Sequence, residues 1–416
     1  MKDTYDLGGV TWAKAERLFR AADAHKPEGQ RFEQWKDSQN AAHNQWDGLR
    51  PGKSSVTPLR VQLLLFPTGE GKSKTSLAQI ASRGFDEIYV VAPPKTHPAW
   101  QRDANVLGVH IELMSHKAFR ERKKFSRKPF IIDEVHMLGS RTGDGWKRLK
   151  RMSGDMPALV MCSATPNYNK PERAFCLTTI GDEDPILNYE KWMQTHCTTE
   201  PNRFAYYPTV TGFLKYDSAI DFLVDHPWVS YVEDTATWTA DTLKIPLPDL
   251  SNFEQLNFSK RHHRLTASDM EKRHKRVELR LIDDDGLIRG EVLKSIDGLM
   301  RQYPERSKWL IFCMHKTVAQ ALHRSVSGAL LIDGDTKTTD VDGLLQQFIN
   351  VQGPEWLIGT TAMATGVDGI DKVCTSMLIL DDIEGDNAKR RQLIGRILPR
   401  GTADKRERLV VTASFE

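Results

Sequence analysis

The sequence predicts an α/β protein of two similar lobes, each a parallel sheet flanked by helices. Short apolar runs bounded by turn residues recur along the chain, and segments of helical period separate them. Continuous apolar runs are typical of strands buried on both faces, which occur in parallel sheets whose crossover helices cover the faces. Five such runs lie in each half of the 416 residues. The chain therefore has enough predicted strands for two sheets.

The predicted strands fix the extent of each lobe. The first half has VQLLLF (61–66), EIYVVA (87–92), VHIEL (109–113), PFIID (129–133) and PALVMC (157–162). The second half has KWLIFC (308–313), GALLI (328–332), EWLIG (355–359), SMLIL and RLVVT (408–412). We therefore expect lobe 1 over residues 51–175 and lobe 2 over residues 301–416.

Two segments lie outside these lobes. Trp12, Ala15 and Phe19 share one helical face and Thr11 is a candidate cap, so residues 1–50 are expected to form a helical N-terminal segment. Residues 176–300 have weak strand signal and a charged stretch of helical character. We expect an inserted, mainly helical region and linker there.

Composition excludes several classes of protein. The 39% hydrophobic and 27% charged residues are typical of globular chains and exclude a long disordered one. The net charge of +3 (58 − 55) is too balanced to indicate nucleic acid or a membrane by itself. The five cysteines form no CxxC pair, which fits a reducing cytosol. The longest apolar stretches are strand-sized, so no membrane contact is expected.

The first predicted strand runs directly into PTGEGKSKTS (67–76) and then a helical segment, the order that binds phosphate. Gly69 and Gly71 let backbone amides approach an anion, Lys72 neutralises phosphate charge, and the Ser73 hydroxyl suits Mg²⁺. The expected nucleotide contacts also include Thr68 and Lys74. Phe66 stands where the first glycine of GxxxxGK[ST] belongs. The alternative is a glycine-rich turn with an exposed lysine.

A second acidic motif follows 61 residues after Lys72 (133 − 72), where PFIIDEVH places Asp133 and Glu134 at the end of a predicted strand. Ligands of open α/β sheets bind at that end. Asp133 is suited to hold Mg²⁺, and Glu134 to orient and deprotonate the attacking water. The alternative is an acidic strand end that caps the next helix, which the presence of both motifs in this order disfavours.

With these motifs, residues 49–412 resemble a superfamily 2 helicase core of the DExH type, which has two RecA-like lobes. The matching segments are PTGEGKS (motif I), VVAPPKTHPAWQRD (Ia), DEVH (II), SATP (III), KWLIFCMHK (IV), GTTAMATGVDGID (V) and QLIGRILPR (VI). The tryptophan of HPAWQRD and the asparagine of SATPNYN resemble Snf-type double-strand translocases. ATGVDGID and QLIGR are similar to compact phage DNA helicases.

The resemblance implies roles for further residues. ATP is expected between the lobes, with Gln392 and Arg396 of lobe 2 reaching the γ-phosphate and Arg396 as an arginine finger. Asp368 is expected to sense nucleotide, and Ser163 and Thr165 to couple it to the polymer. Two departures from the family stand out. Three residues separate Arg396 from Arg400 where the family has two, which puts a second finger at Arg400 in doubt. The adenine-reading pattern LRPYQ is LRPGK here, so a preference for ATP is not secured.

The polymer contacts have two candidate sources. Lys117 to Lys128 holds seven basic residues and one acid, so Lys123 and Lys124 are candidate phosphate contacts, the alternative being a solvated loop. The resemblance favours Lys95, Lys316, and Thr360 or Thr361, whose matching positions touch the nucleic-acid backbone.

We therefore expect an ATP- and Mg²⁺-dependent DNA helicase or translocase that moves on or remodels duplex or branched DNA. The alternatives are a DExH RNA helicase and an ATP-gated nucleic-acid clamp that does not unwind. The expected partners are nucleic acid, DNA in preference to RNA, and a protein that loads the motor or acts in replication or repair. A monomer in the cytoplasm is expected, the host cytoplasm if a phage encodes it.

Overall fold

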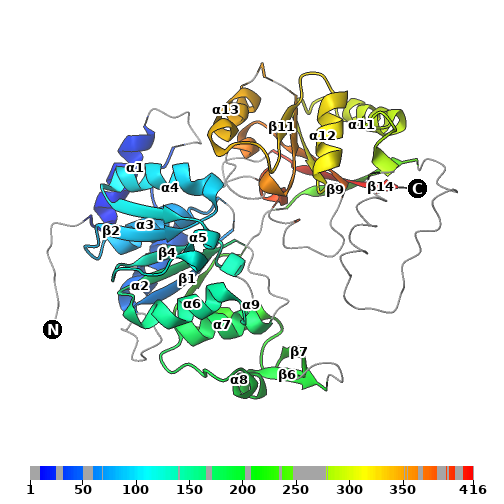
Figure 1. Ribbon diagram of the computed structural model, residues 1–416. Helices are drawn as coiled ribbons and strands as arrows, with labels where there is room; N and C mark the ends of the chain where they lie inside the picture. Colours follow the sequence, from blue (N-terminus) through cyan, green and yellow to red (C-terminus); the bar gives the residue numbers. More distant parts are fainter. Residues whose placement is uncertain are drawn as a thin grey trace. The chain divides into compact units, whose positions relative to one another are not determined.

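The computed structural model describes residues 10–24, 31–49, 60–67, 69–138, 141–164, 171–201, 208–233, 237–246, 278, 280–350, 352–353, 355–363, 369–381, 390, 393–398 and 406–415. They belong to two compact units, Met1–Asp234 (unit 1) and Thr235–Glu416 (unit 2) (Figure 1). No helix among these residues is long and apolar enough to cross a bilayer.

Unit 1 is built on a six-stranded parallel sheet of order β3-β2-β4-β5-β1-β8. Its strands are β1 (Val61–Leu65), β2 (Glu87–Val91), β3 (His110–Met114), β4 (Phe130–Ile132), β5 (Leu159–Ser163) and β8 (Val229–Tyr231). Alternate residues of a strand point to opposite faces. Leu63 and Leu65 accordingly enter one core, and Leu64 and Phe66 enter the other.

Helices cover both faces of this sheet. One core contains side chains from α1 (Trp12–Asp23), α2 (Asp37–Gly48), α3 (Lys72–Ala81) and α4 (His97–Leu107). The opposite core contains α5 (His116–Glu121), α6 (Asp144–Met152), α7 (Pro171–Gly181), α8 (Tyr189–His196) and α9 (Ala219–Val224). Figure 1 shows α6, α7 and α9 together on one side of the sheet. A hairpin of β6 (Cys197–Glu200) and β7 (Thr209–Phe213) follows α8.

The N-terminal helices are part of unit 1 rather than a separate layer. Thr11 caps α1 by accepting from the Lys14 backbone N–H at 3.2 Å, as the sequence predicts. Phe19 is fully buried in the core that also contains α3 and α4. The Lys74 ammonium of α3 lies 4.1 Å from the centroid of the Phe19 ring and pairs with Asp103 of α4 at 2.9 Å. The N-terminal segment is thus joined to the helix that follows the glycine-rich loop.

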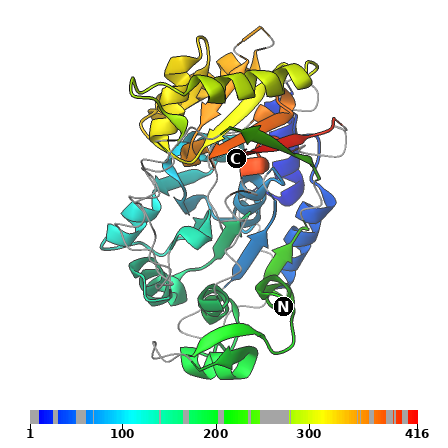
Figure 2. The ribbon, with the colours of Figure 1, turned by 90° about the vertical axis from the view of Figure 1, so that its right-hand side faces the viewer.

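Unit 2 has a second six-stranded parallel sheet, of order β11-β12-β10-β13-β14-β9. Its strands are β9 (Thr239–Ile245), β10 (Trp309–Cys313), β11 (Leu330–Ile332), β12 (Trp356–Gly359), β13 (Ser376–Asp381) and β14 (Leu409–Phe415). One core contains α11 (Gly290–Gln302) and α12 (Lys316–Ser325), and the other contains α13 (Thr338–Ile349). Figure 2 shows α11 lying across one face of this sheet.

The fold class is as predicted, and all ten predicted strands are present. The inserted, mainly helical region expected over 176–300 stays a prediction, and its described residues include the strands β8 and β9 as well as helices. That stretch is divided between the units at Asp234, and its strands β8 and β9 each complete one sheet at an edge. An edge strand is solvated on one side, so it needs fewer apolar residues. β8 has only three residues, and most residues of β9 are exposed or half-buried. Neither has the apolar run that marked the other strands.

Candidate functional site

Three of the predicted motifs converge at the carboxyl edge of the unit 1 sheet. β1 pairs with β5 so that Leu65 lies opposite Ser163, and β4 pairs with β5 so that Ile132 lies opposite Met161. Because all these strands are parallel, their carboxyl ends meet at one edge. The glycine-rich loop after β1, the carboxylates after β4 and the last residue of β5 are therefore neighbours.

The glycine-rich loop has the backbone conformation that its glycines were expected to provide. Gly69 and Gly71 have φ of 88° and 78°, in the left-handed region that favours glycine. Gly71 is the N-cap of α3, so the loop leads directly into the positive end of that helix. Ser73 lies in the first turn of α3 and is half-buried. Thr68 lies outside the described residues.

The start of α2 holds this loop from the side. Glu70 accepts from Lys36 Nζ at 2.5 Å and from Ser38 Oγ at 2.7 Å. The buried Gln39 donates from Nε2 to Thr75 Oγ1 of α3 at 2.9 Å. A Cβ on Gly71 would lie 2.4 Å from Gln39 Nε2, so the loop and α2 are in close contact. Sequence reasoning missed these positioning residues, because nothing in 36–39 matches a family pattern.

Lys72 folds back over the loop. Its Nζ donates to the carbonyl oxygens of Phe66 and Pro67, at 3.0 Å in each case. Its positive charge acts on Asp133 and partly offsets the effects that raise the pKa of that carboxyl. Lys72 therefore links the loop electrostatically to the acidic motif after β4.

Asp133 is a buried carboxyl with a strongly perturbed proton affinity. Burial, and then the neighbouring Glu134, raise the pKa of Asp133 to about 7 against the opposing charge of Lys72. Its backbone is fixed on two sides. The N–H donates to Val91 O, and the carbonyl accepts from His116 Nε2, both at 2.9 Å. Burial lowers the pKa of His116 to about 4, so this histidine is neutral at pH 7. His116 is a second positioning residue that the sequence did not indicate.

Glu134 combines burial with backbone strain. Its φ is 48°, and among the described residues no other non-glycine has a positive φ. Its N–H donates to Asp133 Oδ1 at 3.0 Å, and its Oε2 lies 3.4 Å from His136 Nδ1. That same Nδ1 lies 3.2 Å from Ser163 Oγ. His136 thus connects the carboxylate of motif II to the hydroxyl of motif III.

The remaining predicted residues of unit 1 fall in different surroundings. Lys95 lies in the short helix η1 (Pro94–Thr96) after β2, at the same carboxyl edge. Lys74 pairs with Asp103 of α4 and lies over the Phe19 ring of α1, on the side of α3 that faces these two helices. Lys123 and Lys124 lie in the loop before β4, at the amino edge of the sheet. Thr165 lies outside the described residues.

In unit 2, the described candidates also follow strand ends. Thr360 is buried after β12, and Thr361 begins η5 (Thr361–Met363) and is exposed. Lys316 begins α12 and pairs with Asp335. The loop before Lys316 is fixed by Asp381 at the end of β13, which accepts from the His315 N–H at 3.0 Å.

Arg396 lies in a turn after Leu393 and is only 5% exposed. Arg408, which sequence reasoning missed, supports that turn: its Nε donates to Ile397 O at 2.5 Å, and its Nη2 donates to Asp371 O at 3.4 Å. Motifs V and VI are thus joined through one buried arginine. Asp368, Gln392 and Arg400 lie outside the described residues.

The donor set after β1 and β4 fits Mg²⁺. Ser73 and Asp133 offer hard oxygen ligands, and Mg²⁺ is bound in proteins by one or two such groups together with water and substrate phosphates. The two adjacent buried carboxyls, with the pKa of Asp133 raised, show an excess of negative charge that a divalent cation would compensate. Among the described residues no group of three or more His, Cys, Asp or Glu forms an all-protein metal cage.

Comparison with solved structures identifies proteins of similar architecture. A variant of S. cerevisiae Dbp5 bound to RNA and ADP BeF3 is similar over 100% of this chain and 90% of its own, with a TM-score of 0.53 and 13% identity. A Sulfolobus solfataricus SWI2/SNF2 ATPase core in complex with dsDNA is similar over 92% and 88%, with a TM-score of 0.38 and 11% identity. No family model and no curated protein matches the sequence. The likeness to the Dbp5 structure establishes the fold of two RecA-like lobes.

The raised pKa of Asp133 predicts a pH-dependent stability in the absence of ligand. The Asp133 carboxyl binds its proton more tightly in the folded protein than in the unfolded chain. Protonation of Asp133 therefore contributes fully to the free energy of unfolding below pH 3.8, and this contribution is lost as the pH rises through about 7. Asp133→Asn removes that loss. Relative to the parent protein, its free energy of unfolding should rise between pH 5 and pH 8, by about 3 kcal/mol.

Urea unfolding in EDTA at both pH values measures this difference. The exposed Asp86 supplies the matched control, because Asp86→Asn makes the same chemical change at the surface. An equal pH response of the two variants would contradict the assignment.

Proposed function

We propose that this protein is a nucleic-acid-dependent ATPase that uses ATP and Mg²⁺ to move along or remodel DNA. The observation that carries the proposal is the carboxyl edge of the unit 1 sheet, where a glycine loop, a lysine and two buried carboxyls lie together. Phosphate, a divalent cation and an activated water are the ligands that such a set of groups serves. The RecA-like fold supports this reading of the edge.

In unit 1, each group has a distinct proposed role. The loop amides around Gly69 and Gly71 and the ammonium of Lys72 bind the phosphates of ATP, while Ser73 and Asp133 would hold Mg²⁺. The bound cation would neutralise charge on the β- and γ-phosphates. Glu134 accepts a proton from the attacking water, and its positive φ is a backbone strain of the kind found at functional sites.

The contact of His136 with both Glu134 and Ser163 supports a coupling role for motif III. Glu134 and Ser163 both lie against Nδ1 of His136. A shift of the Glu134 carboxylate on hydrolysis therefore changes which of these two partners is available to His136. Ser163, together with Thr165, is therefore the proposed connection from the nucleotide to the polymer.

The proposed functions of unit 2 and of the polymer contacts rest on the family resemblance. Arg396 is the proposed arginine finger, Gln392 and Arg400 are additional candidates near the γ-phosphate, and Asp368 is the proposed nucleotide sensor. Lys95, Lys316, Thr360 and Thr361 are the proposed backbone contacts. Such contacts bind phosphate and sugar and give little sequence preference. DNA is proposed over RNA on the Snf-like and phage-like motif details.

The first prediction concerns the polymer. Steady-state ATP turnover should be low without polymer and should rise most with duplex or forked DNA, less with single-stranded DNA, and least with RNA. Parallel ATPase assays with each polymer measure this. Stronger stimulation by RNA would indicate the RNA helicase, and tight binding with slow turnover on every polymer would indicate the clamp.

The second prediction separates binding from hydrolysis. Lys72→Ala should weaken ATP binding at least about 10-fold, because it removes charge that contacts phosphate. Glu134→Gln should leave binding within about 3-fold of the parent but lower kcat by about 10²-fold or more, because only the proton acceptor is lost. Titration with a fluorescent ATP analogue and steady-state kinetics measure the two effects.

Lys74→Ala is the matched control for Lys72→Ala, since Lys74 lies two residues along the same helix but contacts Asp103. It should keep nucleotide affinity. Loss of ATP binding in Lys74→Ala, or in Glu134→Gln to the extent seen in Lys72→Ala, would show that the roles are wrongly assigned.

The third prediction compares the two arginines of motif VI. Arg396→Ala should lower polymer-stimulated kcat by about 10³-fold, the scale of arginine fingers, while polymer affinity stays close to that of the parent. Arg400→Ala should lower kcat less, because a proline at position 399 disfavours a helical geometry that would direct Arg400 toward the phosphate. A larger loss of kcat at Arg400 would place the finger there instead.

A further inference from the structure

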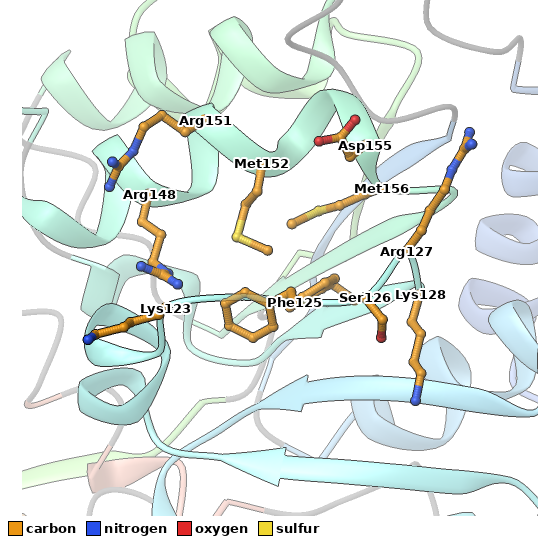
Figure 3. A pocket seen from close by; sticks show the side chains of 11 residues that line it. Lys123, Phe125, Ser126, Arg127, Lys128, Arg148, Arg151, Met152, Asp155 and Met156 are labelled. Atoms are coloured by element: carbon orange, nitrogen blue, oxygen red, sulfur yellow. The ribbon is translucent and has the colours of Figure 1, made fainter.

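A pocket of about 430 Å³ opens at the amino edge of the unit 1 sheet. Its walls are the loop that precedes β4 and the C-terminal part of α6, with the residues that follow α6 toward β5. Figure 3 shows Arg148, Arg151 and Lys123 on one side of Phe125, and Arg127 and Lys128 on the other. The proposed ATP site lies at the opposite, carboxyl edge, so this pocket is a separate site.

The rim of the pocket carries an excess of positive charge. Five cationic side chains and one carboxylate, Asp155, line it. Lys128 pairs with Glu87 at 2.8 Å, but within the described part of the chain Lys123, Arg127 and Arg148 make no ion pair. Burial lowers the pKa of Arg148, and the charges of Arg151 and Arg122 lower it further. Cations crowded in this way favour an anionic ligand.

The floor of the pocket is apolar. Phe125, Met152 and Met156 lie between the two groups of cations. The Phe125 ring is held from below by Tyr89 and Phe130, with ring centroids 5.2 and 5.3 Å away. The Arg148 guanidinium lies 5.2 Å from the centroid of the Phe125 ring. Arg122 also lies over this ring, 4.8 Å from its centroid. The half-buried ring and the arginines around it therefore offer a base an apolar contact bordered by cations.

We propose that this pocket binds one unstacked nucleotide of a single-stranded nucleic acid, with the base against Phe125, Met152 and Met156 and the flanking phosphates on the rim cations. The proposal extends the proposed motor function by adding a second polymer contact at the amino edge of unit 1.

Two features of the pocket suit a nucleic-acid strand. Three of the rim cations are arginines, whose planar donors match phosphate oxygens in pairs. The apolar floor between the cations suits the flat face of a base, which an acidic side chain does not have, and this favours a nucleic-acid strand over an acidic peptide. A duplex keeps its bases stacked, so the apolar floor suits a single strand.

The test compares two pairs of substitutions on one helix. Arg148→Gln with Arg151→Gln removes two pocket cations, and Lys147→Gln with Lys150→Gln removes the same charge from α6 outside the pocket. Binding of a fluorescent dT12 strand is measured without ATP at several NaCl concentrations. The pocket pair should lose about 10-fold in affinity at low salt, and its log–log salt slope should fall by about 1.4, the value for two phosphate contacts on a single strand.

The proposal would be overturned if both pairs of substitutions lowered the affinity for dT12 equally, or if the pocket pair did not lower it. Lys123→Gln against Lys124→Gln repeats the comparison with single changes at exposed residues, of which only Lys123 lines the pocket, and so avoids any folding defect of the double variants. A poly-glutamate peptide that displaces dT12 as well as unlabelled dT12 does would also overturn it in favour of an acidic partner.

Photo-crosslinking tests the apolar floor directly. A strand that carries one 5-iododeoxyuridine should crosslink to Phe125 in the parent protein, and crosslinks confined to other segments would contradict base binding here. ATP turnover without polymer should be unchanged in the pocket variants. If the protein crosslinks at Phe125 but polymer does not stimulate its ATPase, the pocket proposal stands and the motor proposal is refuted. The two proposals can therefore fail separately.

Discussion

The burial of Asp133 beside Glu134 is the constraint on which the candidate site depends. Two adjacent carboxyls at the end of a buried strand repel each other, and burial penalises the charged form of each. Their position is tolerated because Lys72 supplies an opposing charge and the backbone of Asp133 is bonded to β2 and to His116. The repulsion between the two carboxyls makes the edge receptive to a cation, so the feature that destabilises the site without ligand favours cation binding.

The glycine loop is supported from outside the sheet, which explains why the N-terminal segment belongs to unit 1. Glu70 at the loop is held by Lys36 and Ser38, and Gln39 contacts both the loop and α3. Lys74 then joins α3 to α1 through Phe19. A loop with two glycines in the left-handed region has little stiffness of its own. Its conformation is therefore set by α2 as much as by β1.

The sequence predicted the strands with the longest apolar runs and the residues that follow them, because burial on both faces leaves a continuous hydrophobic signal. It could not predict β8 and β9, which are short or half-exposed at a sheet edge. Contacts between residues that are separated in the sequence could not be predicted either, because they follow no local pattern. Examples are the contacts of Gln39 with Thr75, of His116 with Asp133 and of Arg408 with Ile397. Motif spacing likewise does not show which side of α3 a residue faces, so it could not predict the contacts of Lys74 with Asp103 and Phe19.

The sheet of unit 1 also separates two kinds of electrostatic environment. Its carboxyl edge carries the buried acids, and its amino edge carries the cationic pocket, with the three-residue strand β4 running from one to the other. β4 is fully buried and is hydrogen-bonded on both sides, to β2 and to β5. It cannot shift alone, since a displacement would break both ladders. A ligand bound in the pocket would therefore leave Asp133 in place, so the proposed ATP hydrolysis and the proposed second polymer contact are expected to contribute independently.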